Sequence, residues 1–339
     1  MIDYSLLKTK RVVFIADMVN DFSHLSIDDF RLEMTTPETY QLIMDGIKAC
    51  CKEAIYYAAP TEFVGHISEH RSDVVLSLWS GEQSRNRKAL VPSICEANDI
   101  CYVGADTYAH VICQDKKLAK EFCQQYGIQG AKDVLLRTDA DVAALETMQY
   151  PLIIKPNYEG GSIGISNNNL VHSYEDAKKL TKELFPIYDT LLAEEYIQGY
   201  EVCICISGVL GQVDIFEGVQ SNFGNQTYIT SGIYGYEYKK GAHAVKSKER
   251  ATNKISSDLK RQLLDLYWGL GKVEVMRIDG RIDRQGTFRL IELSPDCSLA
   301  PKASTATSYY YAGYSYQEMI ASLLTNAVRN QEYQNAKKR

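Results

Sequence analysis

A chain of 339 residues is long enough for two or three domains with substantial cores, and 45% hydrophobic residues is ordinary for a soluble protein. Its net charge of -6 gives no general attraction to phosphate backbones or anionic lipid, so we expect neither nucleic acid nor a membrane surface as a partner. No apolar run approaches the ~20 residues that span a bilayer, and residues 1–10 lack a signal peptide's apolar core. We therefore expect a cytoplasmic protein. The nine cysteines include no Cys-x-x-Cys pair, which indicates reduced core residues rather than a disulfide or zinc framework.

The first hundred residues alternate between predicted strands and helices. The apolar run from Arg11 to Asp17 predicts a strand buried on both faces of a parallel sheet. Thr36 and Pro37 supply the N-cap and first-turn proline of an amphipathic helix. Such alternation predicts an α/β domain with ligands at the carboxyl ends of its strands. The polar segment from Ser80 to Lys88 follows one such end and suits either a solvated loop or part of a substrate pocket. Further predicted elements are strands over 54–58, 74–79 and 100–103 and a helix over 88–97.

The next segment predicts two helices over 105–126, with Asp115 capping the second and Gly127 ending it. Lys116 lies in the first turn of that second helix, where the helix dipole disfavours a cation. A nearby anion would explain this placement, and so would an ordinary surface position. A small α+β unit follows, with a strand over 132–136, a helix from Asp139 and a capped helix after Ser173.

The stretch from Tyr150 to Gly164 carries the clearest functional pattern. Its apolar first half predicts a buried strand that ends at Lys155 and Pro156. The glycines that follow, grouped around Ser162, allow several backbone N–H groups to approach one anion. The pattern therefore predicts a phosphate cradle, and the alternative is a tight hairpin with a returning strand over 163–166. The glycines are Gly160, Gly161 and Gly164.

Acidic residues follow in an apolar strand over 190–197, which carries Glu194 and Glu195, with Glu201 close behind. Carboxylates at a strand end are suitable acceptors for the N–H and O–H donors of adenine and ribose. Two further strands are predicted over 202–207 and 213–217. The segment 221–243 shows no periodicity and is long enough for a lid or an ordered functional loop.

Segments 273–279 and 288–294 predict a hairpin, with a helix expected before it from Ser256 to Trp268. Strand alternation puts Arg277 and Asp279 on one face, and Glu292 can share that face across the ladder. Two carboxylates together with triphosphate oxygens are a suitable ligand set for Mg²⁺. The alternative is a surface salt-bridge ladder with Arg277.

These motifs together form an ordered series that resembles the ATP-grasp superfamily, most closely its D-alanine-D-alanine ligase branch. The similarity runs from about Val74 to Val328. It implies an α/β and α+β three-part ATP-grasp fold, with a Rossmann-like N-terminal domain over 1–104, a central lid domain over 105–193 and a catalytic domain over 194–339. The series comprises Asp115 and Lys116, Ile154 to Pro156, Glu159 to Gly164, Glu194 to Ile197, Glu201, Arg277 to Asp279, and Glu292.

The resemblance also implies roles for these residues. ATP and Mg²⁺ would bind between the last two domains. The family phosphorylates a carboxylate to an acyl phosphate, which an amine then attacks to give an amide. The implied contacts are Lys116 and Lys155 with the ATP phosphates, the loop from Glu159 to Gly164 over them, Glu194, Glu195, Tyr196 and Ile197 with adenine, Glu201 with ribose, and Asp279 and Glu292 with Mg²⁺. Arg277 would lie beside the reacting carboxylate, and Lys239 or Lys240 would reach the γ-phosphate.

The chain departs from the family where amino acids are bound. Ser294 replaces the asparagine that is the third metal ligand, and residues 295–301 replace the substrate segment that follows it. The glycine-serine-glutamate segment after the first strand is missing from residues 14–26. We therefore expect a ligase for amino acids or a short peptide whose product is not D-alanyl-D-alanine. The expected pocket lining is more charged, with Asp17, Asn20 and Asp21 on one side, Asp296, Cys297, Ser298 and Lys302 on the other, and the loop 82–88 between them.

Two other classes of function stay open at this point. Ser294 at a metal position would also suit a nucleotide-binding protein without ligase turnover. A small-molecule carboxylate kinase would stop at the phosphorylated product. Family members are often dimers, but the sequence does not decide the oligomeric state.

Overall fold

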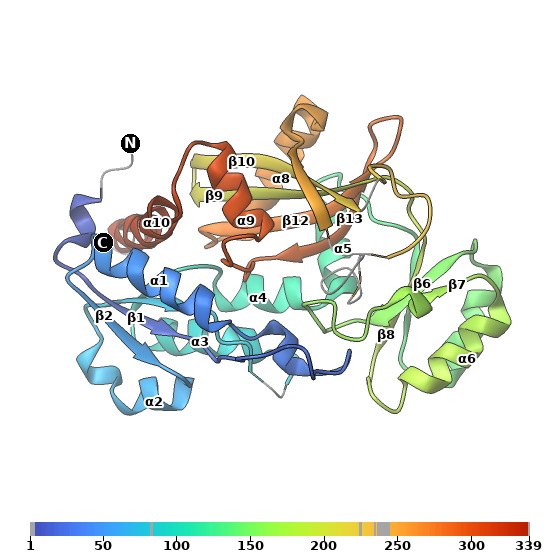
Figure 1. Cartoon of the computed structure of the whole chain (residues 1–339), viewed down its shortest axis with the longest axis horizontal. Helices are drawn as coiled ribbons and strands as arrows, with labels where there is room; N and C mark the ends of the chain where they lie inside the picture. Colours follow the sequence, from blue (N-terminus) through green and yellow to red (C-terminus); the bar gives the residue numbers. More distant parts are fainter. Residues whose placement is uncertain (1–3, 82–83, 224–225, 234, 236–244, 338–339) are drawn as a thin grey trace.

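Three separate β-sheets follow one another along the chain in this computed structural model, which describes residues 4–81, 84–223, 226–233, 235 and 245–337. Figure 1 shows the N-terminal sheet beneath the C-terminal sheet, with the middle sheet to one side. The mixture of a parallel sheet with helices and two antiparallel sheets agrees with the predicted fold class. The three sheets surround the region where the predicted site residues lie.

The N-terminal sheet is parallel and has the strand order β2-β1-β3-β4. Its order reverses between β1 and β3, and ligands of open α/β sheets bind at the carboxyl ends of the strands at such a point. The strands are β1 (Arg11–Ile15), β2 (Glu53–Tyr57), β3 (Val74–Ser77) and β4 (Cys101–Tyr102), and the helices around them are α1 (Pro37–Cys50), α2 (Pro60–Gly65) and α3 (Leu90–Ala97).

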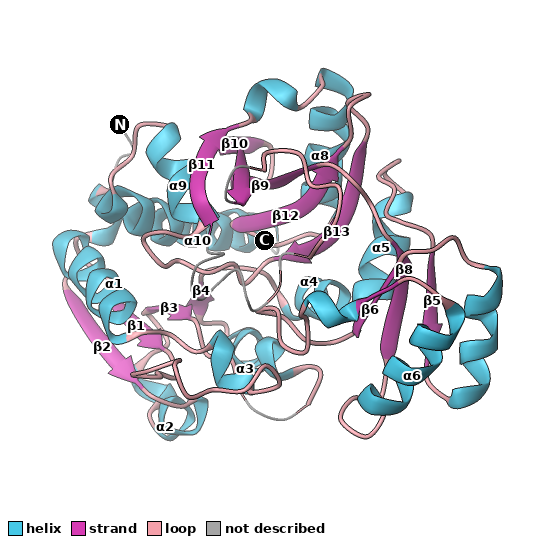
Figure 2. Ribbon diagram, turned by 45° about the vertical axis from the view of Figure 1, so that its right-hand side comes forward, coloured by secondary structure: helices cyan, strands magenta, loops and turns pink. Residues whose placement is uncertain are grey.

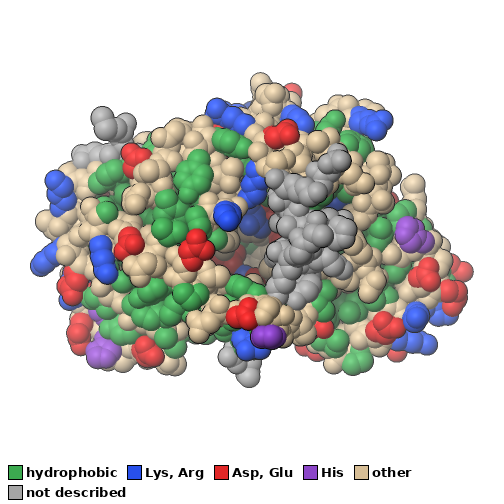
Figure 3. All heavy atoms as spheres, viewed as in Figure 1, with side chains coloured by type: hydrophobic (Ala, Val, Ile, Leu, Met, Phe, Trp, Pro, Cys, Tyr) green, Lys and Arg blue, Asp and Glu red, His purple; other side chains and the backbone are tan. Residues whose placement is uncertain are grey.

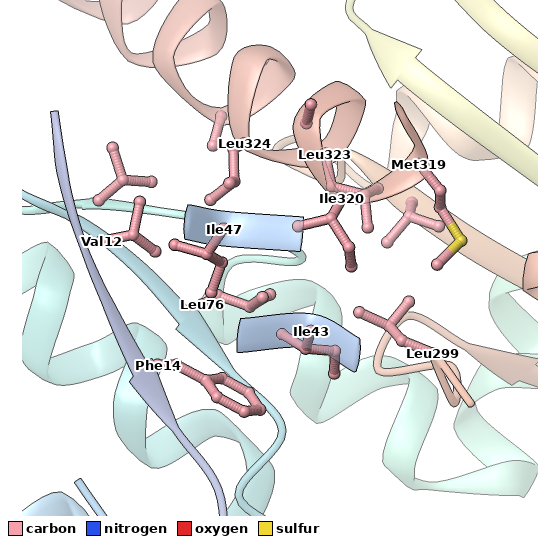
Figure 4. Packing of buried hydrophobic residues seen from close by; sticks show 14 of the residues in the cluster. Val12, Phe14, Ile43, Ile47, Leu76, Leu299, Met319, Ile320, Leu323 and Leu324 are labelled. Carbon is pink, nitrogen blue, oxygen red and sulfur yellow. The ribbon is translucent and has the colours of Figure 1, made fainter. Parts of the chain in front are cut away.

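Helix α1 begins as its sequence predicts, because the Thr36 side chain accepts a hydrogen bond from the Thr39 backbone N–H. Its buried face packs against the long C-terminal helix α10 (Tyr316–Lys337). A Cβ on Gly46 would lie only 3.0 Å from Ile320 Cγ1, so glycine permits the close approach of these two helices. Figure 4 shows Ile43 and Ile47 of α1 facing this contact.

One hydrophobic core joins the N-terminal and C-terminal sheets. It contains Val12 and Phe14 of β1, residues of α10, and Cys205 and Val275 of the C-terminal sheet. The last helix of the chain therefore packs on the first sheet as well as on its own (Figure 4). The outer two parts of the molecule are held together by shared apolar packing.

The middle sheet has its own core, formed only by residues between 134 and 193. Its strands pair antiparallel in the order β5-β8-β6-β7, and the predicted domain boundary at residue 193 falls inside β8. The elements are β5 (Asp133–Leu136), β6 (Leu152–Pro156), β7 (Leu170–Val171), β8 (Leu191–Glu195), the 3₁₀ helix η5 (Asp139–Thr147) and α6 (Tyr174–Leu184).

The returning strand of the glycine segment was predicted in the wrong place. It is β7, which starts at Leu170 instead of Ile163. The Asn169 side chain explains the difference, because its Nδ2 donates to the carbonyls of Ile154, at 2.7 Å, and Gly164, at 2.9 Å. These bonds tie residues 157–169 into a longer loop before strand pairing begins.

The C-terminal sheet is antiparallel, with the order β11-β10-β9-β12-β13. Strand β10 continues to Phe223, so the segment predicted as an irregular loop from Ser221 begins within the sheet. Helix α8 starts where expected, and the Ser256 side chain caps it by accepting from the Leu259 N–H. The elements are β9 (Tyr200–Val209), β10 (Gln212–Phe223), β11 (Val245–Arg250), β12 (Val275–Ile282), β13 (Phe288–Ser294), α8 (Ser257–Gly269) and α9 (Ser304–Tyr311).

Helices α4 (Thr107–Gln114) and α5 (Lys116–Gln124) connect the three sheets (Figure 2). They break at Asp115, whose side chain caps α5 by accepting from the Leu118 N–H, as the sequence predicts. Lys116 therefore starts a helix between the sheets. None of the helices in the described part of the chain is long and apolar enough to cross a membrane.

Candidate active site

A cavity of about 1050 Å³ lies where the three sheets meet, and it contains most of the predicted site residues. Figure 3 shows the molecule hollowed near its centre, with charged side chains inside the hollow. The predicted residues that line it are Lys116, Lys155, Glu159, Gly160, Gly161, Ser162, Glu194, Glu195, Ile197, Glu201, Arg277, Asp279, Glu292 and Ser294. Gly164 and Tyr196 do not line it, and Lys239 and Lys240 fall outside the described residues.

Strands β6 and β8 bring Lys155 and Glu194 together inside the middle sheet. Lys155 Nζ lies 2.5 Å from a Glu194 carboxylate oxygen, and Lys120 of α5 pairs with the other oxygen. Burial works against the charged form of Glu194, but the two ammonium groups outweigh it and lower the pKa of Glu194 to about 2. Burial and the ammonium groups of Lys120 and Lys116 lower the pKa of Lys155. One carboxylate therefore pairs with two lysines at the predicted nucleotide end of the cavity.

Lys116 is almost fully buried, which excludes the ordinary surface position that the sequence left open. Its Nζ donates to the Glu159 carbonyl and lies 3.3 Å from a Glu292 carboxylate oxygen. The anion that explains a cation in the first turn of α5 is thus Glu292, supplied by β13. Lys116 joins the glycine loop to the acidic hairpin.

The glycine loop lines the cavity with only part of its length. Ser162 and Gly161 both have positive φ values, 65° and 60°, so the loop turns sharply there. The Gly164 N–H is already used, because it donates to the Ile27 carbonyl at 3.0 Å. A Cβ at Gly164 would also lie 2.5 Å from the Tyr188 hydroxyl oxygen, so this glycine serves packing instead of facing the cavity.

The predicted adenine and ribose residues are held by partners that the sequence did not reveal. Arg281 Nε donates to a Glu201 carboxylate oxygen at 2.6 Å, and the Arg281 guanidinium also lies over the Tyr196 ring. Tyr196 donates its hydroxyl to the Gly232 carbonyl, which explains why it does not line the cavity. The Glu195 side chain accepts from the Gln149 N–H.

Strands β12 and β13 bring together the predicted arginine and acids. Asp279 and Glu292 are direct partners across the ladder, as are Arg277 and Ser294. Arg277 donates to both oxygens of Asp279, at 2.8 Å and 2.7 Å, and to the Ser294 hydroxyl at 3.2 Å. Burial opposes the charge on Arg277, but Asp279 outweighs it and raises the arginine's pKa. This register agrees with the expectation that Glu292 can share one face of the hairpin with Arg277 and Asp279.

A buried ionic cluster lies at the other end of the cavity. The sequence pointed to Asp296, Glu159 and the loop that contains Arg87 and Lys88, but not to their pairing, and it did not single out Glu33. Lys88 lies between Glu33, at 2.7 Å, and Asp296, at 2.5 Å. Arg87 joins Glu33, at 3.0 Å, to Glu159 of the glycine loop, at 2.9 Å. Burial works against these charges, but the paired charges outweigh it and lower the pKa of Glu33 and of Asp296. Glu33 lies in a short 3₁₀ helix, so no sequence motif marked it.

The expected charged lining is therefore correct on one side and wrong on the other. Asp296, Cys297, Ser298 and Lys302 line the cavity, whereas Asp17, Asn20 and Asp21 do not. Asp17 instead accepts hydrogen bonds from the backbone N–H groups of Ser80 and Gly81, and Asn20 and Asp21 are exposed. Glu33 supplies the N-terminal carboxylate in their place.

His110 is a second lining residue that the sequence did not single out. It lies on α4, is 8% exposed and lines the cavity. Burial lowers the pKa of His110 to about 4, the ammonium groups of Lys88 and Lys272 act in the same direction, and Asp296 opposes them. A lone histidine in a helix carries no motif, so only its position in the fold reveals it.

Comparison with known proteins agrees with this geometry. The family model described as the D-ala D-ala ligase C-terminus matches residues 123–325. D-alanine-D-alanine ligase B of Pseudomonas putida is 30% identical over 252 residues, which cover 69% of this chain and 71% of that protein. The D-alanine-D-alanine ligase of Halalkalibacterium halodurans is 25% identical over 296 residues, which cover 85% of this chain and 92% of that protein.

Solved structures share the fold. A D-alanine-D-alanine ligase from Bacillus anthracis complexed with ATP superposes with a TM-score of 0.73 and 16% identity. The superposition covers 96% of this chain and all of that chain. A D-Ala:D-Ser ligase from Enterococcus faecalis superposes with a TM-score of 0.69 and 19% identity, and the superposition covers 94% of this chain and all of that chain. The chain belongs to the D-alanine-D-alanine ligase branch of the ATP-grasp superfamily, whose members are ADP-forming ligases that make carbon-nitrogen bonds.

Proposed function

We propose that this protein uses ATP and Mg²⁺ to join two amino acids, or an amino acid and a short peptide, through an acyl phosphate. The observation that supports this most directly is that one cavity contains the lysines of β6 and α5, the glycine loop and the facing residues of the β12-β13 hairpin. Phosphoryl transfer depends mainly on positioning and charge neutralisation, and these groups can supply both.

The proposed nucleotide contacts follow the family assignment. Lys116 and Lys155 would bind ATP phosphates, since each is a buried ammonium that lines the cavity. Glu195 and Ile197 would contact adenine, and Glu201, oriented by Arg281, would accept from ribose. Because Glu194 already pairs with Lys155, it would act by holding that lysine in place.

The residues of the hairpin fit Mg²⁺. Asp279 and Glu292 are hard oxygen donors that face each other in register, and Ser294 adds a hydroxyl at the end of the same strand. Mg²⁺ usually binds one or two carboxylates and takes its remaining ligands from water and phosphate oxygens, so these residues would be enough to hold it. Among the described residues no group of three or more His, Cys, Asp or Glu could hold a metal. When bound, Mg²⁺ would neutralise charge on the phosphate oxygens. Arg277 would then orient the reacting carboxylate.

We further propose that D-alanyl-D-alanine is not the product. The segment after the hairpin places Asp296 in the cavity, where it pairs with Lys88 of the N-terminal region. Lys88 in turn pairs with Glu33, so the amino-acid end of the cavity is lined by a connected ionic cluster. A pocket built around different polar groups rejects the wrong substrate, because mismatched buried groups lose their partners.

An assay of ADP and inorganic phosphate release tests the proposal. The protein is incubated with ATP, Mg²⁺ and pooled amino acids, and the products are identified by mass spectrometry. We expect pool-dependent ADP formation and a condensed product. A stable phosphorylated small molecule would indicate a kinase instead, and absence of stimulation by every pool would indicate nucleotide binding without turnover. Efficient condensation of D-alanine as sole amino acid would refute the proposed specificity.

A further inference from the structure

The cavity does not end at the Arg277 and Asp296 region. It continues to the carboxyl edge of the N-terminal sheet, where the strand order reverses between β1 and β3. We call this extension the N-terminal arm and define it by six lining residues. They are Thr39, Leu78, Trp79, Pro92, Tyr102 and Val103. The cavity volume of about 1050 Å³ lies at the upper end of the range of about 300 to 1,000 Å³ that is typical of ligand pockets.

The charged groups next to the arm are already paired. Among the described residues of the N-terminal region, only Glu33 and Lys88 are charged and line the cavity. Lys88 lies between Glu33 and Asp296, and Glu33 also pairs with Arg87. A charged substrate side chain in the arm would therefore find no free counter-ion among these residues, and its desolvation would go uncompensated.

The hydroxyl groups in and beside the arm each make at least one hydrogen bond within the protein. The Tyr102 hydroxyl donates to Glu96 at 2.7 Å, and the Thr39 hydroxyl accepts from the Thr36 hydroxyl at 2.9 Å. The Ser77 hydroxyl, at the end of β3, accepts from the Trp79 N–H. What the arm offers to a ligand is thus mainly the apolar surface of Leu78, Trp79 and Val103, and burying such surface is favourable for an apolar group.

We propose that the N-terminal arm binds an uncharged substrate side chain larger than the methyl group of alanine, either branched aliphatic or aromatic. This rests on the proposed ligase function and names the substrate class for it. The sequence led us to expect a more charged lining from two groups of residues, and through it a charged or polar substrate side chain. Asp296, Cys297, Ser298 and Lys302 do line the cavity, but Asp17, Asn20 and Asp21, on the N-terminal side where the arm lies, do not. Each methylene accommodated in an apolar pocket changes kcat/KM by a factor of ~10 to ~200, so the preference should be large.

Two measurements test the arm, and the second of them does not depend on turnover. The first is ADP formation with pairs drawn from alanine, leucine, phenylalanine, aspartate and lysine in both enantiomers. The second is calorimetric binding of the same amino acids to the protein loaded with a non-hydrolysable ATP analogue and Mg²⁺. We expect leucine or phenylalanine to exceed alanine, aspartate and lysine at least tenfold in kcat/KM and in affinity. Binding of the large side chains without turnover would support the arm and refute the ligase function. Turnover restricted to alanine or charged amino acids would retain the ligase function and overturn the arm.

Substitutions of Val103 locate the effect. Val103→Phe fills the arm and should lower kcat/KM for the preferred amino acid at least tenfold, with the KM for ATP unchanged. Val103→Ala enlarges the arm and should shift the substrate preference from leucine toward phenylalanine. This variant provides a test if the Val103→Phe protein does not fold. The control is Val111→Phe on the exposed face of α4, which does not line the cavity and should change neither preference. An unchanged preference in both Val103 variants would overturn the assignment.

Discussion

At the scale of single residues, the nucleotide end of the cavity depends on Glu194. This carboxylate pairs with Lys120 and Lys155, and all three side chains are buried. Removal of one partner from a buried ionic group leaves uncompensated charge, which typically costs about 3 to 5 kcal/mol. The lowered pKa of Glu194 means that its contribution to stability is present above pH 4.5 and is lost as the pH falls through about 2.

We therefore expect Glu194→Gln to lower the free energy of unfolding by about 3 kcal/mol or more near neutral pH. Urea denaturation followed by circular dichroism would measure it. The neighbouring Glu195→Gln is the matched control. The ion pair of Glu195 is weaker, because its partner Lys132 is exposed and the two charged groups are 3.8 Å apart, so its loss should cost less than about 1 kcal/mol. Equal effects of the two substitutions would contradict the role given to Glu194.

The facing carboxylates of β12 and β13 lead to a second prediction. Asp279→Asn and Glu292→Gln should each reduce turnover by about 100-fold or more, because each removes a charge that would hold Mg²⁺ against the triphosphate. Steady-state ADP formation and the unfolding midpoint would be measured together. Asp258→Asn on the exposed start of α8 should leave both unchanged. A Glu292 or Asp279 variant with near-normal turnover would refute the metal assignment.

His110 allows a prediction of pH dependence. The groups acting on it are Asp296, Lys88, Lys272 and Glu96, and burial is the largest influence on its lowered pKa. Because the unfolded histidine titrates near 6.5 and the folded one near 4, the unfolded state binds the proton first as the pH falls. When the pH falls from about 7.5 to about 5, this difference in proton binding should lower the free energy of unfolding by about 2 kcal/mol.

Urea denaturation at the two pH values would test this. His110→Gln should show a smaller loss on acidification than the unsubstituted protein, by about 2 kcal/mol, because the titrating group is gone. His24→Gln should show the full loss, since His24 is exposed. If the two variants lost stability equally, His110 would not be the group responsible.

At the scale of elements, the segment between β1 and α1 holds the glycine loop. The Ile27 carbonyl accepts from the Gly164 N–H, Asp28 accepts from the Tyr188 hydroxyl, and Arg87 bridges Glu33 and Glu159. These contacts join the N-terminal sheet to the loop that is proposed to cover the phosphates. The loop is therefore positioned from outside its own sheet.

Arg87→Met should weaken that positioning. It keeps an unbranched side chain but removes both ion pairs, so we expect the KM for ATP to rise about tenfold with a smaller change in kcat, a loss of about 1.4 kcal/mol. Arg71→Met, at an exposed position in the turn before β3, is the control and should leave both constants unchanged. An unaltered KM for ATP in the Arg87 variant would show that the bridge does not position the loop.

The elements that the sequence predicted are those with local signals. Thr36 and Asp115 cap helices where expected, a helix starts at Ser256 as expected, and strand alternation predicted that Asp279 and Glu292 can share one face. The elements that it missed depend on distant partners. Asn169 delays the return strand by bonding to β6, and Glu33 becomes a site residue only because Arg87 and Lys88 approach it from another segment. Such partners have no periodicity that a single segment could reveal.

At the scale of the whole molecule, the three predicted domains are not equally separate. The N-terminal and C-terminal sheets share a core through α1 and α10, whereas the middle sheet packs on its own residues. Its described links to the rest include the bonds between Asn157 and α5 and those between the glycine loop and the N-terminal segment. We therefore expect two bodies that unfold separately, with the cavity between them.

Hydrogen exchange on two core variants would test this division. Leu145→Ala truncates a fully buried residue of the middle core and should accelerate exchange over residues 133–195, leaving β1 and β9 protected. Ile320→Ala truncates a fully buried residue of α10 and should accelerate exchange in both β1 and β9, because α10 packs on the first and last parts of the chain alike. If Ile320→Ala accelerated exchange only in the C-terminal sheet, the shared core would not couple the two outer sheets. If Leu145→Ala lowered protection throughout the molecule, the middle sheet would not unfold as a separate body.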